Sequence, residues 1–398
     1  MKLKSVNSID HSICTGCMMC SDICVKGAIS FKYDTGFWFP CVDKSKCVEC
    51  GLCSLRCPAL NEVPIVTGPV SCYGAKSKDD DVRWNSTSGG FFFELATAVI
   101  KEGGACIGAE YGLDNEILHS IETEQEGIKK LRQSKYAQSR TEGIYTKTQR
   151  LLDSGVYVLF CGTPCQVEAL NAYLKKNYEN LLTMDFFCLG ICSPLVYRRY
   201  LDLMELRYKS KVTKVWFKNK QKGWRKIGTR LEFASGESYF RTGNRDLFMV
   251  AFVGDSIAMR KNCETCKFRK IPHNSDITVA DFWGIEKVNL EMDDDKGVSA
   301  IIINTPRGAI WFDKISRSLD VFETTEDSIV KGNFSAIEPK KAGKNRDAFL
   351  NAISNEMPLD MAMEKYGEMY NGINKIKVDC HYYRNSFISK IKKIIKSI

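Results

Sequence analysis

Long apolar runs are missing from this chain of 398 residues. The first ten residues contain no apolar core of the kind that marks a signal peptide, and no stretch approaches the run of about eighteen apolar residues that a membrane-spanning helix needs. We therefore expect a cytoplasmic protein, in whose reducing environment free thiols persist. With 44% hydrophobic and 26% charged residues, a chain of this length is expected to form two or three globular domains.

The sequence is also poor in the motifs of familiar catalytic sites. It has four histidines, and none has the spacing of a metal site or of a catalytic triad. Neither the G-x-G-x-x-G fingerprint of dinucleotide-binding folds nor the Walker pattern of P-loop proteins is present. Hydrolytic and nucleophilic chemistry are therefore not indicated, and the sequence predicts no catalytic side chain.

Cysteine is abundant, and eight of the 18 cysteines form two runs of the pattern C-x2-C-x2-C-x3-C, offset by 33 residues. Three thiolates spaced in this way fit one [4Fe–4S] cubane, and in bacterial two-cluster ferredoxins the fourth ligand comes from the other run. Pro58 follows the second run as that pattern expects, whereas Val25 replaces the proline after the first run. The sequence thus predicts two [4Fe–4S] clusters, the first held by Cys14, Cys17, Cys20 and Cys57 and the second by Cys47, Cys50, Cys53 and Cys24.

Two other interpretations of the cysteine runs are weaker. Zinc sites usually present two C-x2-C pairs without a third internal cysteine, and a disulfide framework suits a short secreted chain. Cys41 lies outside both runs and is expected to be a buried thiol.

The order of apolar runs and turn residues divides the chain. Residues 1–65 hold the cysteine runs and a hairpin around Gly36–Pro40, and residues 61–69 read as a linker. From residue 70 onward strands and helices alternate, which predicts a sheet covered by helices. The expected fold class is therefore α+β or α/β, a small ferredoxin-like iron–sulfur module followed by a mixed α/β domain. Its expected segments are 1–65, 70–150, 151–330 and a helical tail at 331–398.

Individual elements follow from the same patterns. Strands are expected at 71–75, 104–109, 116–121, 156–160, 181–187, 277–280 and 299–304. Helices are expected at 91–101, 123–132, 141–153, 194–206, 307–315 and 347–353, and another is expected to follow the turn at 161–165 and to end at about 174.

Basic residues concentrate in residues 209–230, which carry nine Lys or Arg and no acid, interleaved with aromatic residues. Such a composition occurs on nucleic-acid surfaces, but nothing else in the chain matches an RNA or DNA module. Alternation of apolar and polar positions favours a twisted β-ribbon with a solvated basic face. With a formal net charge of +9, the chain is expected to dock an acidic electron carrier or an anionic coenzyme there, and no nucleic acid.

The last fifteen residues, Arg384–Ile398, contain five basic residues and no acid, with apolar residues at helical spacing. A basic amphipathic helix of this kind lies on an anionic membrane, docks a partner, or packs on its own core. Peripheral membrane contact through this tail is therefore one of three expectations.

Cys165, Cys188, Cys263 and Cys266 are four further cysteines of interest. The first follows a predicted strand, the second ends one, and the last two form a C-x2-C knuckle. The carboxyl ends of adjacent parallel strands open onto one crevice, so these thiols could converge there. Taken alone, such residues are as well explained as small buried apolar groups.

Two glycine-containing turns precede predicted helices, at Ser88–Gly90 and at Gly162–Thr163. Backbone N–H groups at a helix start favour a phosphate. Ordinary helix caps that use glycine for close packing explain both turns equally well.

Seven motifs, taken together and in order, resemble the coenzyme F420 hydrogenase/dehydrogenase beta-subunit family over about residues 70–330. They are Thr87–Gly90, Gln133–Ser139, Gly162–Gln166, Cys188–Gly190, Arg260–Cys266, Ser275–Thr278 with Asp281–Gly284, and Lys296–Ser299.

This resemblance implies an FAD-containing reductase domain with its own [4Fe–4S] cluster. It assigns the third cluster to Cys165, Cys188, Cys263 and Cys266, and the flavin contacts to Ser88, Gly89, Gly90, Lys135, Tyr136, Ser139, Gly162 and Thr163. The chain departs from the family where Leu189 replaces a frequent histidine and where Cys161 and Cys192 are additional. Because members also occur in organisms without the deazaflavin, the substrate is not carried over.

The expected function is that of an iron–sulfur flavoprotein oxidoreductase. It would pass electrons between [4Fe–4S] clusters and FAD, exchange a hydride with coenzyme F420 or another two-electron substrate, and take single electrons from a low-potential carrier or a partner redox subunit. A non-catalytic electron-relay subunit is one alternative. A reductase of polysaccharide or nucleotide-sugar biosynthesis is the other.

Overall fold

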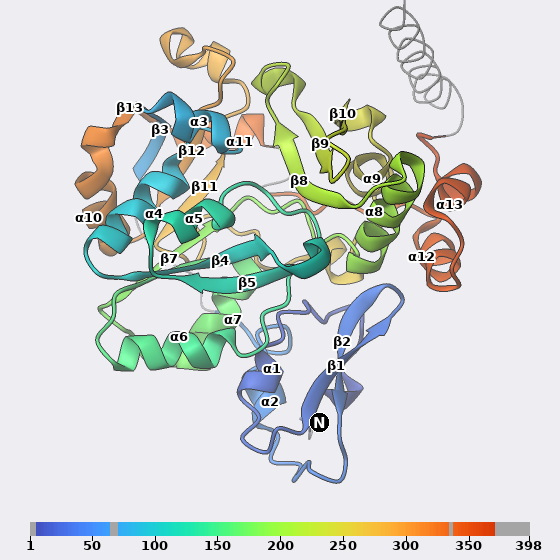
Figure 1. Ribbon diagram of the computed structural model, residues 1–398. Helices are drawn as coiled ribbons and strands as arrows, with labels where there is room; N and C mark the ends of the chain where they lie inside the picture. Colours follow the sequence, from blue (N-terminus) through green and yellow to red (C-terminus); the bar gives the residue numbers. More distant parts are fainter. Residues whose placement is uncertain (1–4, 64–70, 334–336, 371–398) are drawn as a thin grey trace, which may run out of the picture.

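The structure is a computed structural model that describes residues 5–63, 71–333 and 337–370. Its N-terminal module contains a β-hairpin and two short helices, one after each cysteine loop (Figure 1). The hairpin is β1 (Ile29–Asp34) and β2 (Phe37–Val42), and the helices are α1 (Met19–Asp22) and α2 (Leu52–Leu55). The hairpin between the two cysteine runs is as the sequence predicts, with its turn at Thr35 and Gly36.

An eight-stranded mixed sheet forms the centre of the second domain, in the order β13-β3-β12-β11-β7-β6-β4-β5. The four strands from β11 to β4 are parallel to their neighbours within that group, and the strands flanking them pair antiparallel. The strands are β3 (Ser71–Ser77), β4 (Ala105–Tyr111), β5 (Ile117–Glu122), β6 (Val158–Cys161), β7 (Leu181–Phe186), β11 (Ile277–Asp281), β12 (Ser299–Ile303) and β13 (Leu319–Thr324). Because segments 70–150 and 151–330 both supply strands, they fold as one unit.

Helices cover both faces of this sheet (Figure 1). On β6, Leu159 packs into the core under α4 and α10, whereas Phe160 packs into the core on the opposite face, as the two-residue period of a strand requires. One face carries α4 (Phe91–Lys101), α5 (Gln125–Leu131) and α10 (Pro306–Ile315), and the other carries α6 (Ile144–Asp153) and α7 (Pro164–Leu174). Two shorter helices, α3 (Asp80–Asn85) and α11 (Glu326–Gly332), complete this part.

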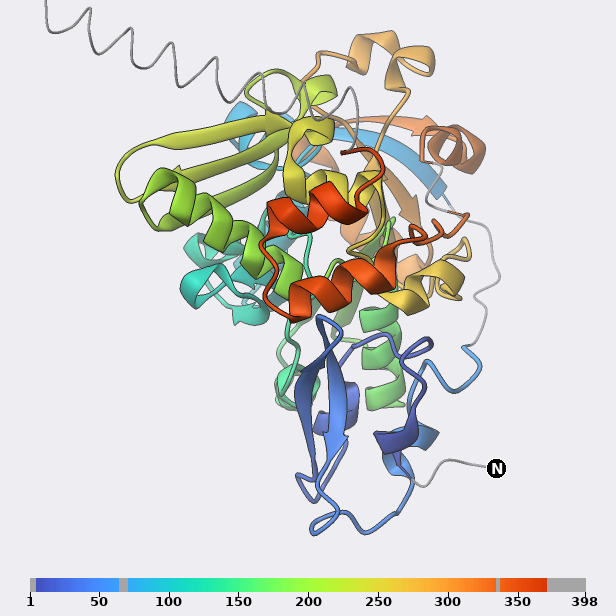
Figure 2. The ribbon, with the colours of Figure 1, turned by 90° about the vertical axis from the view of Figure 1, so that its right-hand side faces the viewer.

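A three-stranded antiparallel sheet stands beside the large one and contains the basic residues 209–230. Its strands are β8 (Val212–Asn219), β9 (Gly228–Phe233) and β10 (Ser238–Thr242). The helices near it are α8 (Pro194–Tyr208), α9 (Leu247–Met249), α12 (Arg346–Ser354) and α13 (Leu359–Tyr366). Figure 2 shows α12 and α13 lying against α8.

The mixed α/β fold class is confirmed, and the structure adds two details. The described part of the predicted helical tail belongs to the core, because Phe349, Leu350 and Ile353 are buried with α8 and α13 residues. The basic ribbon does not present all its lysines to solvent, because a β-bulge between Trp216 and Asn219 turns residues of this stretch inward. The predicted basic helix at 384–398 lies outside the described residues.

Within the described part of the chain, no helix combines the length and apolar character needed to cross a bilayer.

Candidate functional site

The two cysteine loops repeat in backbone conformation as well as in spacing. Gly16 and Glu49, the residues before the second cysteine of each run, have φ of 71° and 51°, and Met18 and Gly51, after that cysteine, have φ of 60° and 73°. Left-handed residues on both sides of a cysteine curl the chain tightly. Each loop therefore turns its first three cysteines toward a common centre.

The first predicted ligand group is gathered and mostly buried. Cys14, Cys17 and Cys57 are each less than a tenth exposed. Burial raises the pKa of Cys20 well above its ordinary value, and the neighbouring thiolates of Cys17, Cys14 and Cys57 raise it further. Four thiols whose charges repel one another in a dry site need a cation to hold them as thiolates, which is what an iron–sulfur centre supplies.

The second predicted group lies at the solvent side of the module. The thiols of Cys24, Cys47, Cys50 and Cys53 line one small hollow of about 30 Å³. Cys50 is exposed, whereas Cys53 is buried. The partition of eight cysteines into these two quartets is thus compatible with the geometry.

The structure also brings together the four cysteines that the family resemblance assigns to a third cluster. Cys165 lies in the first turn of α7, Cys188 just beyond β7, and Cys263 in a short 3-10 helix. Burial raises the pKa of Cys165 well above normal, with further contributions from Cys266 and Cys188. Burial raises the pKa of Cys188 to about 12, chiefly assisted by the charge of Cys263. A charge on Cys17 of the first group also reaches Cys165, so the third group is a neighbour of the first.

No three His, Cys, Asp or Glu side chains among the described residues converge tightly enough for a single metal ion. A cubane binds each thiolate at a different iron corner, so its ligands stand further apart than those around one ion. The donor sets therefore suit clusters rather than mononuclear sites.

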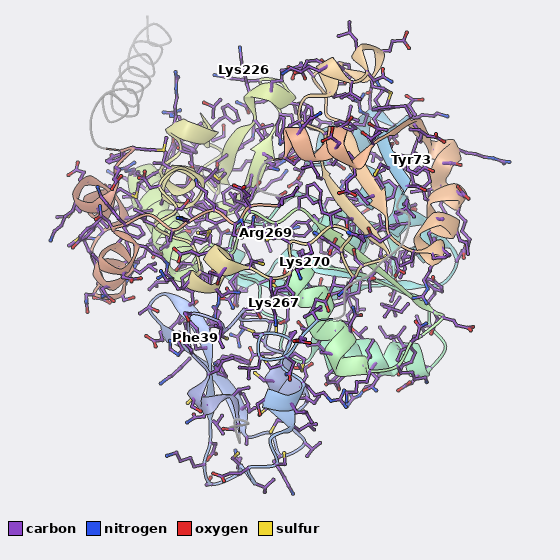
Figure 3. All side chains as sticks on the ribbon, turned by 180° about the vertical axis from the view of Figure 1, so that it is seen from behind. Phe39, Tyr73, Lys226, Lys267, Arg269 and Lys270 are labelled. Atoms are coloured by element: carbon purple, nitrogen blue, oxygen red, sulfur yellow. The ribbon has the colours of Figure 1, made fainter. Side chains whose placement is uncertain are left out.

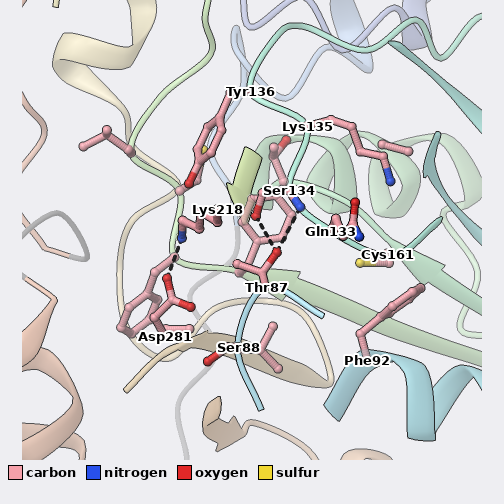
Figure 4. A pocket seen from close by; sticks show the side chains of 18 of the residues that line it. Thr87, Ser88, Phe92, Gln133, Ser134, Lys135, Tyr136, Cys161, Lys218 and Asp281 are labelled. Atoms are coloured by element: carbon pink, nitrogen blue, oxygen red, sulfur yellow. Dashed lines mark hydrogen bonds and ion pairs between the residues drawn. The ribbon is translucent and has the colours of Figure 1, made fainter. Parts of the chain in front are cut away.

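A large cavity of about 620 Å³ opens at the carboxyl ends of the parallel strands (Figure 4). Cys161 at the end of β6, Cys188 after β7 and Asp281 at the end of β11 all line it. This is the crevice where open α/β sheets bind ligands, and the volume suits an organic cofactor. Since Cys188 lies in its wall, the cavity borders the third cysteine group.

Seven of the eight predicted flavin-contact residues line this cavity: Ser88, Gly90, Lys135, Tyr136, Ser139, Gly162 and Thr163. Gly89 is the exception. Its N–H donates to the Ser299 hydroxyl at 3.1 Å, and a Cβ at Gly89 would come within 2.3 Å of the Ala75 carbonyl oxygen. Gly89 is thus a close-packing residue behind the wall.

The two glycine-containing turns in the cavity wall precede helices that differ in their N-terminal capping. At α7, Thr163 and Gln166 form a capping box, in which the Thr163 N–H donates to Gln166 Oε1 at 2.9 Å. At α4, Gly90 has φ of 95° and the helix start has no side-chain cap. The helix start at α4 is therefore the one that leaves N–H donors for an anion.

Two lysines in the wall behave differently. The Lys135 ammonium donates to the carbonyls of Lys130 and Arg132, and burial lowers its pKa to about 7. The Lys218 ammonium pairs with the Asp281 carboxylate at 2.5 Å, beside Tyr136 (Figure 4). Burial opposes the charge on Lys218, but the Asp281 carboxylate outweighs it and raises the pKa of Lys218. Lys135 therefore holds its own loop, and Lys218 with Asp281 forms a charged pair facing the cavity.

Sequence reasoning missed His119 and Lys218. His119 on β5 lines the cavity, is 5% exposed, and neither ring nitrogen has a hydrogen-bond partner. Burial lowers its pKa to about 4, so the ring is neutral at pH 7. No local motif marks either residue, because a strand histidine and a ribbon lysine are unremarkable until the strands are placed around the cavity.

The module is fastened to the α/β domain close to the first cysteine group. Thr141 and Tyr145 both donate their hydroxyls to the Cys17 carbonyl at 2.7 Å. On the opposite side, the Lys267 ammonium donates to the Ala59 carbonyl at 3.3 Å, and Figure 3 shows Lys267 on the segment that faces the module. The loop of the first cysteine group is therefore hydrogen-bonded directly to the domain that carries the third group.

Comparison with known proteins gives two family matches. Residues 13–61 match the model described as a 4Fe-4S dicluster domain, and residues 156–328 match the model that describes the C terminus of the coenzyme F420 hydrogenase/dehydrogenase beta subunit. A search of curated proteins found no match.

Among solved structures, the chain is similar to one from the F420-reducing [NiFe] hydrogenase complex of Methanosarcina barkeri. The sequence identity is 18% and the TM-score 0.45, over 79% of this chain and 97% of that chain. The protein thus combines an N-terminal 4Fe-4S dicluster domain with a segment, residues 156–328, that is similar to the C terminus of the coenzyme F420 hydrogenase/dehydrogenase beta subunit.

Proposed function

We propose that this protein is an iron–sulfur flavoprotein that carries electrons between its dicluster module and an FAD in the large cavity, where coenzyme F420 or another two-electron carrier exchanges a hydride. The observation that carries the proposal is the position of the third cysteine group. Cys165 of this group lies on α7, which contacts α1 of the module, and Cys188 of the same group lies in the cavity wall. When bound, a flavin exchanges both single electrons and hydrides, which is the chemistry needed at this junction.

The cavity residues fit a flavin nucleotide. The uncapped start of α4 at Gly90 offers backbone donors to a phosphate group. Apolar side chains such as Ile117 and Leu131 offer a surface for a planar ring system and limit water in the cavity. The unpartnered, neutral His119 supplies one donor and one acceptor for a polar ring edge.

Hydride exchange needs alignment of two rings rather than a side-chain acid or base. The chain's role is therefore to position the bound rings, and the Lys218–Asp281 pair is fixed in a suitable place to orient a polar group. The basic stretch contributes Lys218, Ile227 and Thr229 to the cavity wall, so an anionic coenzyme tail would meet it there. A one-electron carrier would instead approach the exposed cysteine group of the module, where Cys50 is exposed and Val48 is 61% exposed.

Cofactor content and electron flow test this proposal. Anaerobically purified protein should hold about twelve irons and one FAD per chain. On mixing with reduced coenzyme F420 or NADH, the flavin band should bleach first and the broad cluster absorbance afterwards. If neither donor, nor reduced ferredoxin from the other end, changes either band at a rate relevant to turnover, the proposal fails and the relay interpretation takes its place.

A pair of lysine variants tests the cavity directly. Lys218→Met leaves the Asp281 carboxylate without its cation, so FAD binding, followed by flavin fluorescence, should weaken by about tenfold. Lys214→Met is the matched control, because Lys214 is exposed on the same strand and lies over the Trp216 ring. Equal affinities for both variants would mean that the flavin does not occupy this cavity.

A further inference from the structure

Arg260 is a fully buried cation at the junction of the two domains. Its side chain is 0% exposed, and its guanidinium lies 4.2 Å from the centre of the Phe39 ring. Its Nε donates to the Cys14 carbonyl at 2.8 Å, and its two terminal nitrogens donate to the Trp38 carbonyl at 3.2 Å. Nη1 also donates to the Gln138 side-chain oxygen at 3.1 Å. Each of these partners is electrically neutral.

Two other buried arginines of this chain each pair with a carboxylate. Arg83, 4% exposed, pairs with Asp294, and Arg346, 7% exposed, pairs with Asp347. Within the described residues no Asp or Glu forms an ion pair with Arg260. A charge held out of water without a counter-ion destabilises a fold by several kcal/mol, on the order of the whole stability of a domain. The buried charge of Arg260 therefore requires a counter-ion other than a carboxylate.

The anionic groups around Arg260 are cysteine thiolates of two different groups. Arg260 touches the backbone of Cys14 and precedes Cys263 by three residues. The Cys263 N–H also donates to the Arg260 carbonyl at 3.1 Å. The guanidinium thus stands between the first group of the module and the third group at the cavity.

We propose that Arg260 is the shared counter-ion of the clusters at Cys14/Cys17/Cys20/Cys57 and at Cys165/Cys188/Cys263/Cys266, and that its charge raises the reduction potentials of these two centres. The inference rests on the proposed function, which places clusters at these cysteines. A cubane with four thiolates is anionic and becomes more so when it gains an electron, so a nearby fixed cation favours the reduced state. The transfer itself moves one electron from one cluster to the next, with no bond made and no proton moved.

The consequence is a preference for where electrons reside. A cluster at Cys24, Cys47, Cys50 and Cys53 would exchange electrons with the carrier, and the charge of Arg260 would favour electrons on the two inner centres. Gln138 connects Arg260 both to the first cysteine loop and to the cavity. Its side chain donates to the Gly16 carbonyl at 3.0 Å, and its neighbours Ala137 and Ser139 line the cavity.

Potentiometric titration followed by EPR, with signals assigned through Cys50→Ser and Cys263→Ser variants, tests the proposal. Arg260→Met removes the charge at similar volume and should shift the two inner clusters to lower potential while leaving the outer one unchanged. Arg260→Lys keeps the positive charge but lacks the planar guanidinium group. The reduction potentials of its clusters should stay near those of the wild type. Unchanged potentials in Arg260→Met, equal shifts of all three clusters, or an equal shift in Arg260→Lys would overturn the inference.

A second variant covers failure of Arg260→Met to assemble. Gln138→Glu places a carboxylate beside Nη1 at nearly constant shape, which cancels the charge and should lower the same two potentials. Thr141→Val is the control, since it removes a neutral donor to the same loop and should shift neither potential as far. No shift in Gln138→Glu would overturn the inference. Wild-type protein with fewer than about twelve irons contradicts the proposed function instead, before any variant is examined.

Discussion

The two cysteine loops of the N-terminal module have the same spacing and the same backbone turns but opposite surroundings. Thr15 in the first loop is 5% exposed, whereas Val48, its equivalent 33 residues later, is 61% exposed. A polar residue is buried and an apolar one faces solvent because the first loop docks on the α/β domain, where Thr141 and Tyr145 donate to the Cys17 carbonyl. Identical local patterns thus make two sites that differ in solvent access and in the charges around them, the properties that set cluster potentials.

Removing a thiolate of the third group is expected to have the largest effect on this arrangement. Cys263→Ser should lower the iron content from about twelve to about eight per chain and cut the path between the module and the cavity. Cys41→Ser is the control, since Cys41 lies outside all three groups, and it should keep the full content. Complete loss of iron from Cys263→Ser would contradict the partition of ligands.

Weakening the attachment of the first loop to the α/β domain should make the two loops more alike in solvent access. The double variant Thr141→Val with Tyr145→Phe removes both donors to the buried Cys17 carbonyl. An unsatisfied buried carbonyl and two lost hydrogen bonds should destabilise the fold by about 3 kcal/mol, measured by anaerobic denaturant unfolding. The iron of the first group should then be released to a chelator earlier than in the wild type. Ser45→Ala, near the second loop and exposed, should change neither quantity.

Glycine substitutions sharpen the comparison further. Gly16 and Gly27 both have left-handed φ, of 71° and 57°, but a Cβ at Gly16 would lie 2.3 Å from Gln138 Nε2 and 2.8 Å from Arg260 Nη1, whereas nothing lies within 4 Å at Gly27. Both alanine variants lose backbone freedom. Gly16→Ala should be destabilised by about 2 kcal/mol more, because it also displaces the buried arginine contact. Equal unfolding free energies would mean that the first loop is not tightly held.

The pH dependence of the free energy of unfolding reports on His119, a buried histidine in the cavity wall. His119 lacks an anionic partner among the described residues, and burial lowers its folded pKa to about 4, below the unfolded value of about 6.5. The unfolded chain therefore binds the extra proton between these values, so this contribution to stability is complete above pH 6.5 and is lost as the pH falls toward 4. At pH 5.5 the loss should be about 1 kcal/mol relative to pH 7.5, and His119→Phe should remove it. A difference between wild type and variant that is independent of pH would contradict the burial argument.

Much of the module could be predicted from the sequence because cluster binding is local. Three cysteines at spacings of three fit one loop whatever surrounds it, and Gly16 and Gly51 mark positions where the chain must turn left-handed. The strands and helices of the α/β domain were also predictable, since apolar periodicity reports which faces are buried. The alternation at Leu159 and Phe160 is one example.

The flanking antiparallel strand β13 and helix α13 escaped prediction, because their short patterns acquire meaning only against β3 and α8. By contrast, the capped helix start at Thr163 does carry a local signal, because Thr163 and Gln166 have the Thr-x-x-Gln spacing of a capping box, and the start at Gly90 lacks it.

What only the tertiary structure decided is which groups share an environment. His119, Lys218 and Asp281 come from three separate strands, two in the large sheet and one in the small sheet, and all three residues line the cavity. Arg260 lies 246 residues from Cys14 in sequence, yet it donates to the carbonyl of Cys14. Spacing along the chain determines what a loop can bind. Burial and nearby charges determine how strongly each centre holds an electron, and both come from residues that are distant in sequence.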